Sequence, residues 1–219
     1  YIAVCCRCYS PAGQGEVDPA VVNNIQNADD AGLGTEVYMT PQPNSVKTGP
    51  EQFDEMYNYL TASGIKLLTV WIQVTSPINW LTSITANVNF ICNIVARAQQ
   101  YGLNVGIYTN YYDWSQITSG LILDDTMLWY WNVNGPGVTG ESPSDFNDFY
   151  SFAGWYTPMV KQFAQVESVC DVTVNRDIYA TSSLVALIGT AEFAKTKQIV
   201  VGVLGLKNTT STSKTKIKP

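Results

Sequence analysis

The chain has 219 residues, of which 46% are hydrophobic and only 14% are charged, and it carries a formal net charge of −6 at pH 7. This length suits one globular domain, and the absence of histidine excludes Ser-His-Asp catalysis, Cys-His catalysis and histidine-ligated zinc. Residues 1–194 hold all 18 acidic residues and only six of the basic ones, which argues against binding of a nucleic-acid backbone.

Strand-like and helix-like segments alternate along the first 134 residues. Residues 1–10 are predicted to form a strand, and Asp18 is the expected N-cap of a helix with Pro19 at its first position, ending before Gly32. The next elements are a strand at 35–40, a helix at 50–63, a strand from Thr69, a helix at about 83–101, a strand at 104–110, a short turn or helix, and a strand at 127–134.

The helices become rarer after residue 134. A loop rich in Gly, Pro and Ser at 135–148 is followed by two strand-like pieces at 158–168 and 170–180. Repeated β-α units predict an α/β fold with a parallel sheet, and we expect a modified βα-barrel, TIM-barrel-like, with reduced helices in its C-terminal part. A doubly wound sheet is the alternative, but no glycine-rich phosphate turn follows the first strand.

The chain divides into two predicted parts. Residues 1–180 form the expected barrel domain, and residues 181–219 form a tail that does not follow the β-α rhythm and is predicted to be partly disordered. No run of 18 apolar residues occurs, so we expect no membrane association through a spanning helix. The five cysteines lack metal-site spacing, and we expect neither a metal nor a cofactor.

Polar and aromatic side chains alternate with aliphatic ones near the ends of several strands. In "TVWIQVTSPINW", residues 69–80, Val70, Ile72 and Val74 alternate with Trp71, Gln73 and Thr75. Binding sites of βα-barrels lie at the carboxyl ends of the strands. Alternation on the other strands adds Glu36, Tyr38, Thr40, Asn104, Tyr108, Asn110, Thr173, Asn175 and Asp177, with the aromatic run Trp129, Tyr130 and Trp131 near the same mouth.

Stacked aromatic rings combined with amide and hydroxyl groups are what a groove for neutral sugars requires. The alternative is that these groups only fill and hydrogen-bond a barrel interior. We assign ligand binding to Tyr38, Trp71, Tyr108, Asn110, Trp131, Asn132, Asn175 and Asp177.

Six segments carry a resemblance to a known family. They are "RCYSPAGQGEVDP", "AGLGTEVYMTPQP", "VWIQVTSPINW", "RAQQYGLNVGIYTNYYDW", "LWYWNVNG" and "KQFAQVESVCDVTVNRD", which together span most of residues 7–179 in order. The chain resembles the nematode lysozyme-like proteins of the Entamoeba type, within glycoside hydrolase family 25. This resemblance implies a modified βα-barrel, secretion, and hydrolysis of peptidoglycan between N-acetylmuramic acid and N-acetylglucosamine.

The departures from the family pattern fall on the catalytic positions. Active members carry Asp-x-Glu where this chain has Gln73 and Thr75, and the family Asp of the last strand matches Asn175, with Asp177 two residues on. A further family acid belongs to a first strand that is missing here and would precede Tyr1. Glycoside hydrolysis generally needs a proton donor and a second group that stabilises the oxocarbenium-like centre, and an amide and a hydroxyl supply neither near neutral pH.

Three interpretations remain. The first is a secreted, monomeric lysozyme-like protein of innate defence whose turnover is weak or lost, with Asp177 or Glu36 as a possible rescuing acid. The second is a non-catalytic, lectin-like protein that binds peptidoglycan or another cell-wall glycan in the same groove. The third is a misassembled product with an open barrel and an exposed edge strand. A cooperative melt would exclude the third, and turnover compared with binding separates the first two.

Overall fold

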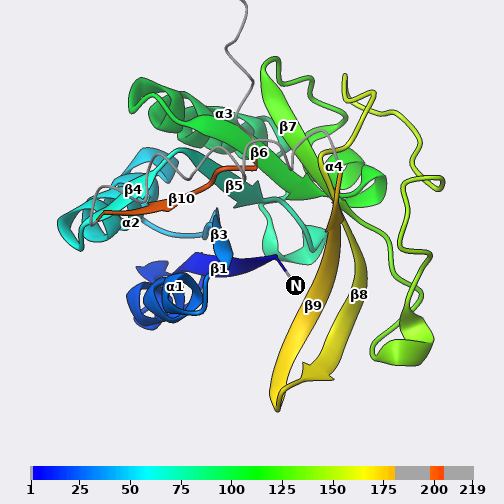
Figure 1. The fold of residues 1–219 in the computed structure, drawn as a ribbon. Coiled ribbons are helices and arrows are strands. Elements are labelled where there is room, and N and C mark those ends of the chain that lie inside the picture. Colours follow the sequence, from blue (N-terminus) through cyan, green and yellow to red (C-terminus); the bar gives the residue numbers. More distant parts are fainter. Residues whose placement is uncertain (1, 181–197, 205–219) are drawn as a thin grey trace, which may run out of the picture.

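The structure, a computed structural model, describes residues 2–180 and 198–204. Its main feature is one curled eight-stranded sheet in the order β2-β1-β3-β5-β6-β7-β8-β9, with helices along its outer face (Figure 1). The strands of this sheet are β1 (Ala3–Ser10), β2 (Glu16–Val17), β3 (Gly34–Met39), β5 (Thr69–Gln73), β6 (Asn104–Thr109), β7 (Thr126–Trp131), β8 (Val160–Val169) and β9 (Val172–Tyr179).

The remaining elements connect and cover these strands. A second, two-stranded sheet pairs β4 (Ile65–Leu67) with β10 (Ile199–Val201). The helices are α1 (Val21–Asp30), α2 (Gly49–Ala62), α3 (Ile84–Gln100) and α4 (Tyr111–Thr118), with short 3-10 turns at Pro77–Asn79 and Val138–Gly140. None of the helices among the described residues is long and apolar enough to cross a membrane.

The α/β class is confirmed, and the described residues after β7 contain no α-helix, in line with the predicted reduction of helices in the C-terminal part. Strands β1, β3, β5, β6, β7 and β8 run parallel, whereas β2 and β9 pair antiparallel at the two edges. Closure into a βα-barrel is not confirmed, because within the described residues no ladder joins β1 to β9. The sheet is therefore a curled half-barrel, with β2 and β9 as its edge strands among the described residues.

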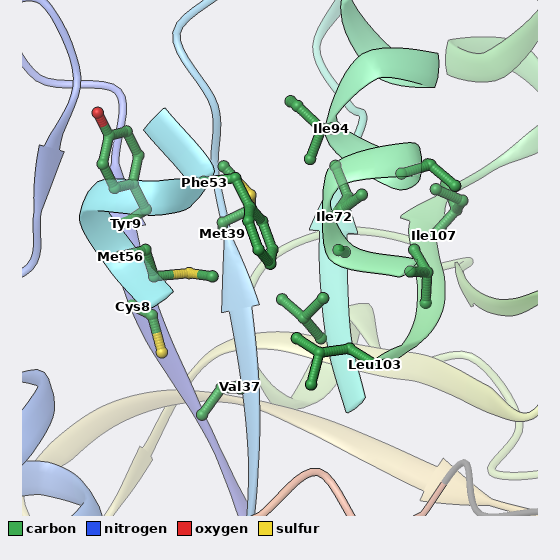
Figure 2. Packing of buried hydrophobic residues seen from close by; sticks show 14 of the residues in the cluster. Cys8, Tyr9, Val37, Met39, Phe53, Met56, Ile72, Ile94, Leu103 and Ile107 are labelled. Atoms are coloured by element: carbon green, nitrogen blue, oxygen red, sulfur yellow. The ribbon is translucent and has the colours of Figure 1, made fainter. Parts of the chain in front are cut away.

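Strand alternation separates two packed clusters. Outward-facing aliphatic residues such as Val70, Ile72 and Val74 pack with the helices in a large outer core, part of which Figure 2 shows. Inward-facing residues form a smaller cluster built on Trp71, Tyr108, Trp129 and Val160. The aliphatic residues thus lie on the outer side of the sheet and the aromatic ones on the inner side, as the alternation in the sequence predicted.

Two predicted boundaries are wrong. Helix α1 begins at Val21 and not at Pro19. The Asp18 carboxylate accepts from the Arg7 guanidinium (3.0 Å) and from the backbone N–H of Ala20 (3.1 Å), which lies just before the helix. It therefore caps no N–H group within the helix. The strand predicted at 127–134 ends at Trp131, after which the chain turns into the long loop.

The tail predicted at 181–219 is described only at residues 198–204. Strand β10 lies there and pairs parallel with β4, and Val201, Val203 and Leu204 are buried. This segment packs against β3, and the backbone N–H of Leu204 donates to the Glu36 carboxyl group (2.9 Å). The prediction of partial disorder falls on residues 181–197 and 205–219, which lie outside the described residues.

Candidate functional site

The curl of the sheet encloses a cavity of about 500 Å³. Seven strands each contribute an inward-facing side chain to its lining: Cys5, Tyr38, Gln73, Tyr108, Trp129, Gln162 and Asp177, from β1, β3, β5, β6, β7, β8 and β9 respectively. Edge residues of β1 and β9, including Val4 and Val174, complete it. The cavity therefore occupies the centre of the half-barrel.

Aromatic rings form the apolar surface of this cavity. The Trp129 ring lies at the centre, with centroid distances of 4.5 Å to Tyr108, 5.7 Å to Trp71 and 6.1 Å to Tyr38. The expectation that Tyr130 shares this surface is wrong, because alternation turns it outward, where its hydroxyl donates to Asp148 (2.7 Å). Tyr38, Tyr108 and Trp129 line the cavity and offer a stacking surface of the kind that sugar rings use, whereas Trp71, a predicted ligand-binding residue, is 1% exposed and does not line it.

The wall formed by β3 and β5, which we call the β5 wall, lines the cavity with Tyr38 and Gln73, neither of which is charged, and Thr40 and Thr75 adjoin Gln73 outside the lining. The Thr40 hydroxyl donates to Gln73 Oε1 (2.6 Å), and Gln73 Nε2 donates to the Thr75 hydroxyl (3.0 Å). The three predicted residues are thus together in one hydrogen-bonded row at the carboxyl end of β5. Such a row can bind hydroxyl and carbonyl groups but has no proton to release near pH 7.

The wall formed by β8 and β9, the hairpin wall, carries the one carboxyl group among the residues that line the cavity. Trp129 Nε1 donates to Asp177 Oδ1 (2.9 Å). Burial raises the pKa of Asp177 to about 7, and the indole donor lowers it only in part. A substantial fraction of this group is therefore protonated near neutral pH, which is the state that a general acid requires.

Gln162 is a cavity residue that sequence reasoning missed. It is 3% exposed, and its Oε1 accepts from the Tyr108 hydroxyl (2.6 Å) and from Asn175 Nδ2 (3.3 Å). Asn175 in turn accepts from the backbone N–H of Val166 (3.2 Å). A polar residue on the inward side of a buried strand was a signal, but its place beside Asp177 depends on the hairpin register.

Glu36 lies outside the cavity lining. It is 1% exposed and accepts from Trp71 Nε1 (2.8 Å), from the backbone N–H of Leu204 (2.9 Å) and from that of Val203. Burial raises its pKa to about 7, while these donors lower it. With its oxygens occupied in this way, Glu36 braces Trp71 against the segment at 198–204 and has no access to a ligand.

Three predicted ligand-binding residues sit at the rim and are used by the protein itself. Asn110 caps α4 by accepting from the backbone N–H of Asp113 (2.7 Å). Trp131 Nε1 donates to the Asp113 carboxylate (3.3 Å), and Asn132 Nδ2 donates to Asp148. None of the three lines the cavity. Asp113, a buried rim acid that sequence reasoning missed, has its pKa raised by burial.

The part of the chain that the structure describes holds no cluster of three or more Cys, Asp or Glu side chains arranged to bind a metal ion. Its five cysteines are free, with Cys170 exposed at the tip of the hairpin. The chemistry on offer in the cavity is therefore aromatic stacking, neutral hydrogen bonding, one carboxyl group and the guanidinium of Arg176, which forms ion pairs with Glu141 and Glu167.

Comparison with known sequences finds similarity to lysozyme-like proteins. The model of the family described as lysozyme-like protein 1 matches residues 1–163. Lysozyme-like proteins 7 and 1 of Caenorhabditis elegans are 55% and 57% identical, over 86% and 82% of this chain. These alignments cover 67% and 61% of the two relatives, so the chain spans about two thirds of their length.

More distant relatives extend the comparison. The probable GH family 25 lysozyme 2 of Dictyostelium discoideum is 33% identical over 79% of this chain and 77% of its own length. Among solved structures, a muramidase from Trichobolus zukalii superposes with a TM-score of 0.61 at 21% identity, covering 85% and 86% of the two chains. The lysozyme from Streptomyces coelicolor gives 0.61 at 20% identity, covering 84% of each. These two structures share the fold of the curled sheet.

Proposed function

Since the chain belongs to the lysozyme-like proteins of glycoside hydrolase family 25, we propose that its cavity binds the glycan strands of peptidoglycan and that hydrolysis there is much slower than in a site with two carboxylates. The observation that carries this proposal is the composition of the two walls. Asp177 is the one carboxyl group in the lining, and Gln73, which lines the same cavity and donates to Thr75, is neutral.

Hydrolysis of a glycosidic bond requires a proton for the leaving oxygen and a second group for the positive centre. Asp177, with a pKa of about 7, is suited to the first role at neutral pH. Gln73 and Thr75 cannot provide the second, because neither ionises in this range. Loss of one such group costs about 10²- to 10⁴-fold in rate, which sets the reduction that we expect.

A second candidate function is glycan binding without hydrolysis. The row from Thr40 through Gln73 to Thr75 favours it, because both polar ends of the amide are engaged and the wall is pre-organised for neutral hydrogen bonds. In this case the cavity is a lectin site. Asp177 then serves as a hydrogen-bonding group and not as an acid.

Four broader proposals accompany this one. We propose that the protein acts outside the cell, as a monomer, in defence against bacteria, and that residues 1–180 form the glycan-binding unit. The cavity lies wholly within that range. Of the residues after 180, we propose that the segment at 198–204 contributes to this unit by covering Glu36.

One assay separates the two functions. Purified bacterial cell walls are incubated with the wild type, with the Gln73→Asp/Thr75→Glu variant and with Asp177→Ala, and released muropeptides and wall-bound protein are measured in the same tubes. An Asn58→Asp/Thr61→Glu variant adds the same charge on the exposed side of α2 and is the matched control.

Slow release by the wild type that Asp177→Ala abolishes supports the weak hydrolase. Binding without release, combined with release by the Gln73→Asp/Thr75→Glu variant, supports the lectin site. A wild type that neither binds the walls nor releases muropeptides contradicts both functions. Release by the wild type at the rate of a two-carboxylate lysozyme contradicts the reduced turnover.

A further inference from the structure

The orientation of one amide in the hairpin wall is determined by the backbone. Val166 has a φ of 55° at a bulge of β8, and its N–H points at the Asn175 side chain (3.2 Å). A backbone N–H can only donate, so the Asn175 atom that it meets is the oxygen. The Asn175 nitrogen must then donate to the next group, which makes the Gln162 atom at 3.3 Å the oxygen as well.

This chain of donors leaves the Gln162 amide nitrogen facing the cavity. Both hydrogen bonds of the Gln162 side chain end on Oε1, and within the described residues the buried side-chain polar atoms without a partner are Thr69 Oγ1 and Glu167 Oε1 alone. Gln162 Nε2 therefore retains accessible surface. Because Gln162 is 3% exposed and lines the cavity, that surface opens into the cavity.

The nitrogen lies next to the candidate acid. Gln162 and Asp177 are direct partners in the β8–β9 ladder, so their side chains leave neighbouring backbone positions on the same face. Asp177 Oδ1 is already engaged by Trp129, which leaves its other oxygen toward the ligand. A ligand group bound by Gln162 is thus placed beside Asp177.

We propose that Gln162 is a specificity-determining residue, whose amide nitrogen donates to a carbonyl oxygen of the bound glycan beside Asp177. This inference rests on the proposed function and deepens it. The ligand chemistry that it selects is a sugar with an acetamido substituent, because the carbonyl oxygen of that group extends further from the sugar ring than a hydroxyl oxygen and can only accept, as an N–H donor requires. A sugar without this group leaves the Gln162 N–H buried without a partner in the complex, which lowers the affinity.

The test compares two tetrasaccharides with the same β-1,4 backbone by titration calorimetry in 150 mM salt. One is built of N-acetylglucosamine and the other of glucose. We expect the wild type to bind the acetylated oligomer at least about tenfold more tightly, which corresponds to one buried hydrogen bond. Gln162→Met, which keeps the length of the side chain and removes the donor, is expected to lose this ratio.

Two further variants sharpen the result. Gln162→Glu replaces the donor with an acceptor and is expected to bind the acetylated oligomer more weakly than Gln162→Met does. Gln165→Glu makes the same change three residues along β8, outside the cavity lining, and is expected to keep the wild-type ratio. Thermal melts verify that each variant is folded, and the wild-type ratio itself does not depend on any variant.

The outcomes separate this inference from the function beneath it. Equal affinity of the wild type for the two oligomers, or an unchanged ratio in Gln162→Met, overturns the role of Gln162 while leaving wall binding intact. Failure to bind the acetylated oligomer despite binding to walls also overturns it. Failure to bind both walls and oligomers overturns the proposed function.

Discussion

The two walls of the cavity differ in kind, although both project from the same sheet. The β5 wall presents Thr40, Gln73 and Thr75 in a closed row of neutral hydrogen bonds. The hairpin wall presents Gln162 and a carboxyl group, Asp177, whose pKa is raised by burial. The difference teaches that the acid can lie on one wall while the other wall contributes only neutral hydrogen bonds. A loss of charge on one wall therefore does not remove the ability of the other to donate a proton.

The largest expected effect comes from removing the acid of the hairpin wall. In the wild-type protein, Asp177→Asn is expected to lower muropeptide release by at least about 100-fold, because a general acid contributes about 10² to 10⁴. Binding to walls should change far less. Asp171→Asn at the exposed tip of the hairpin is the control. An unchanged rate in Asp177→Asn would show that the acid lies elsewhere.

The next effect concerns stability as a function of pH. Burial holds the pKa of Glu36 at about 7, above its unfolded value near 4.5. The folded state thus binds more protons than the unfolded state between these values. The contribution of Glu36 to the free energy of unfolding is therefore fully present below about pH 4.5 and is lost as pH rises through 7, by up to about 3 kcal/mol. The absence of histidine leaves few other groups that titrate in this window.

Urea unfolding at pH 5 and pH 8 measures this difference. Glu36→Gln has no charge to bury and is expected to show a smaller loss of stability between the two pH values, with the contribution of Asp177 remaining. A free energy of unfolding that rises from pH 5 to pH 8 in the wild type would contradict the direction of both pKa shifts.

A smaller effect tests how the hairpin wall is held in place. Tyr108→Phe removes the hydroxyl that donates to Gln162 Oε1 (2.6 Å) and is expected to cost about 1 kcal/mol of unfolding free energy. The variant Tyr112→Phe, whose ring is 64% exposed, is the matched control and should be near neutral. If both changes cost the same, the hydroxyl does not anchor the wall.

The smallest effect concerns the β5 wall. Thr40→Val removes the donor to Gln73 Oε1 (2.6 Å) while keeping the shape of the side chain. Thr40 is only half-buried and water can replace its hydroxyl, so we expect a cost of about 0.5 kcal/mol in urea unfolding. A cost larger than that of Tyr108→Phe would reverse the ranking of the two walls.

The sequence by itself determined the alternation and the outline of the site. The pattern of "TVWIQVTSPINW" places Trp71 and Gln73 inside and the aliphatic residues outside, as the structure shows. The motifs of the same chain also determined its family. Such features are readable because they depend only on period-2 geometry and on residue identity along one strand.

Only the tertiary structure decided which polar groups face a ligand and which are used within the protein. Glu36 and Asp177 are both inward-facing acids on their strands, yet the segment at 198–204, far away in sequence, occupies the first. Gln162 became a site residue only through the hairpin register that sets it beside Asp177. Hydrogen bonds between residues 50 to 170 positions apart depend on how strands pair and curl, and no local pattern records that arrangement.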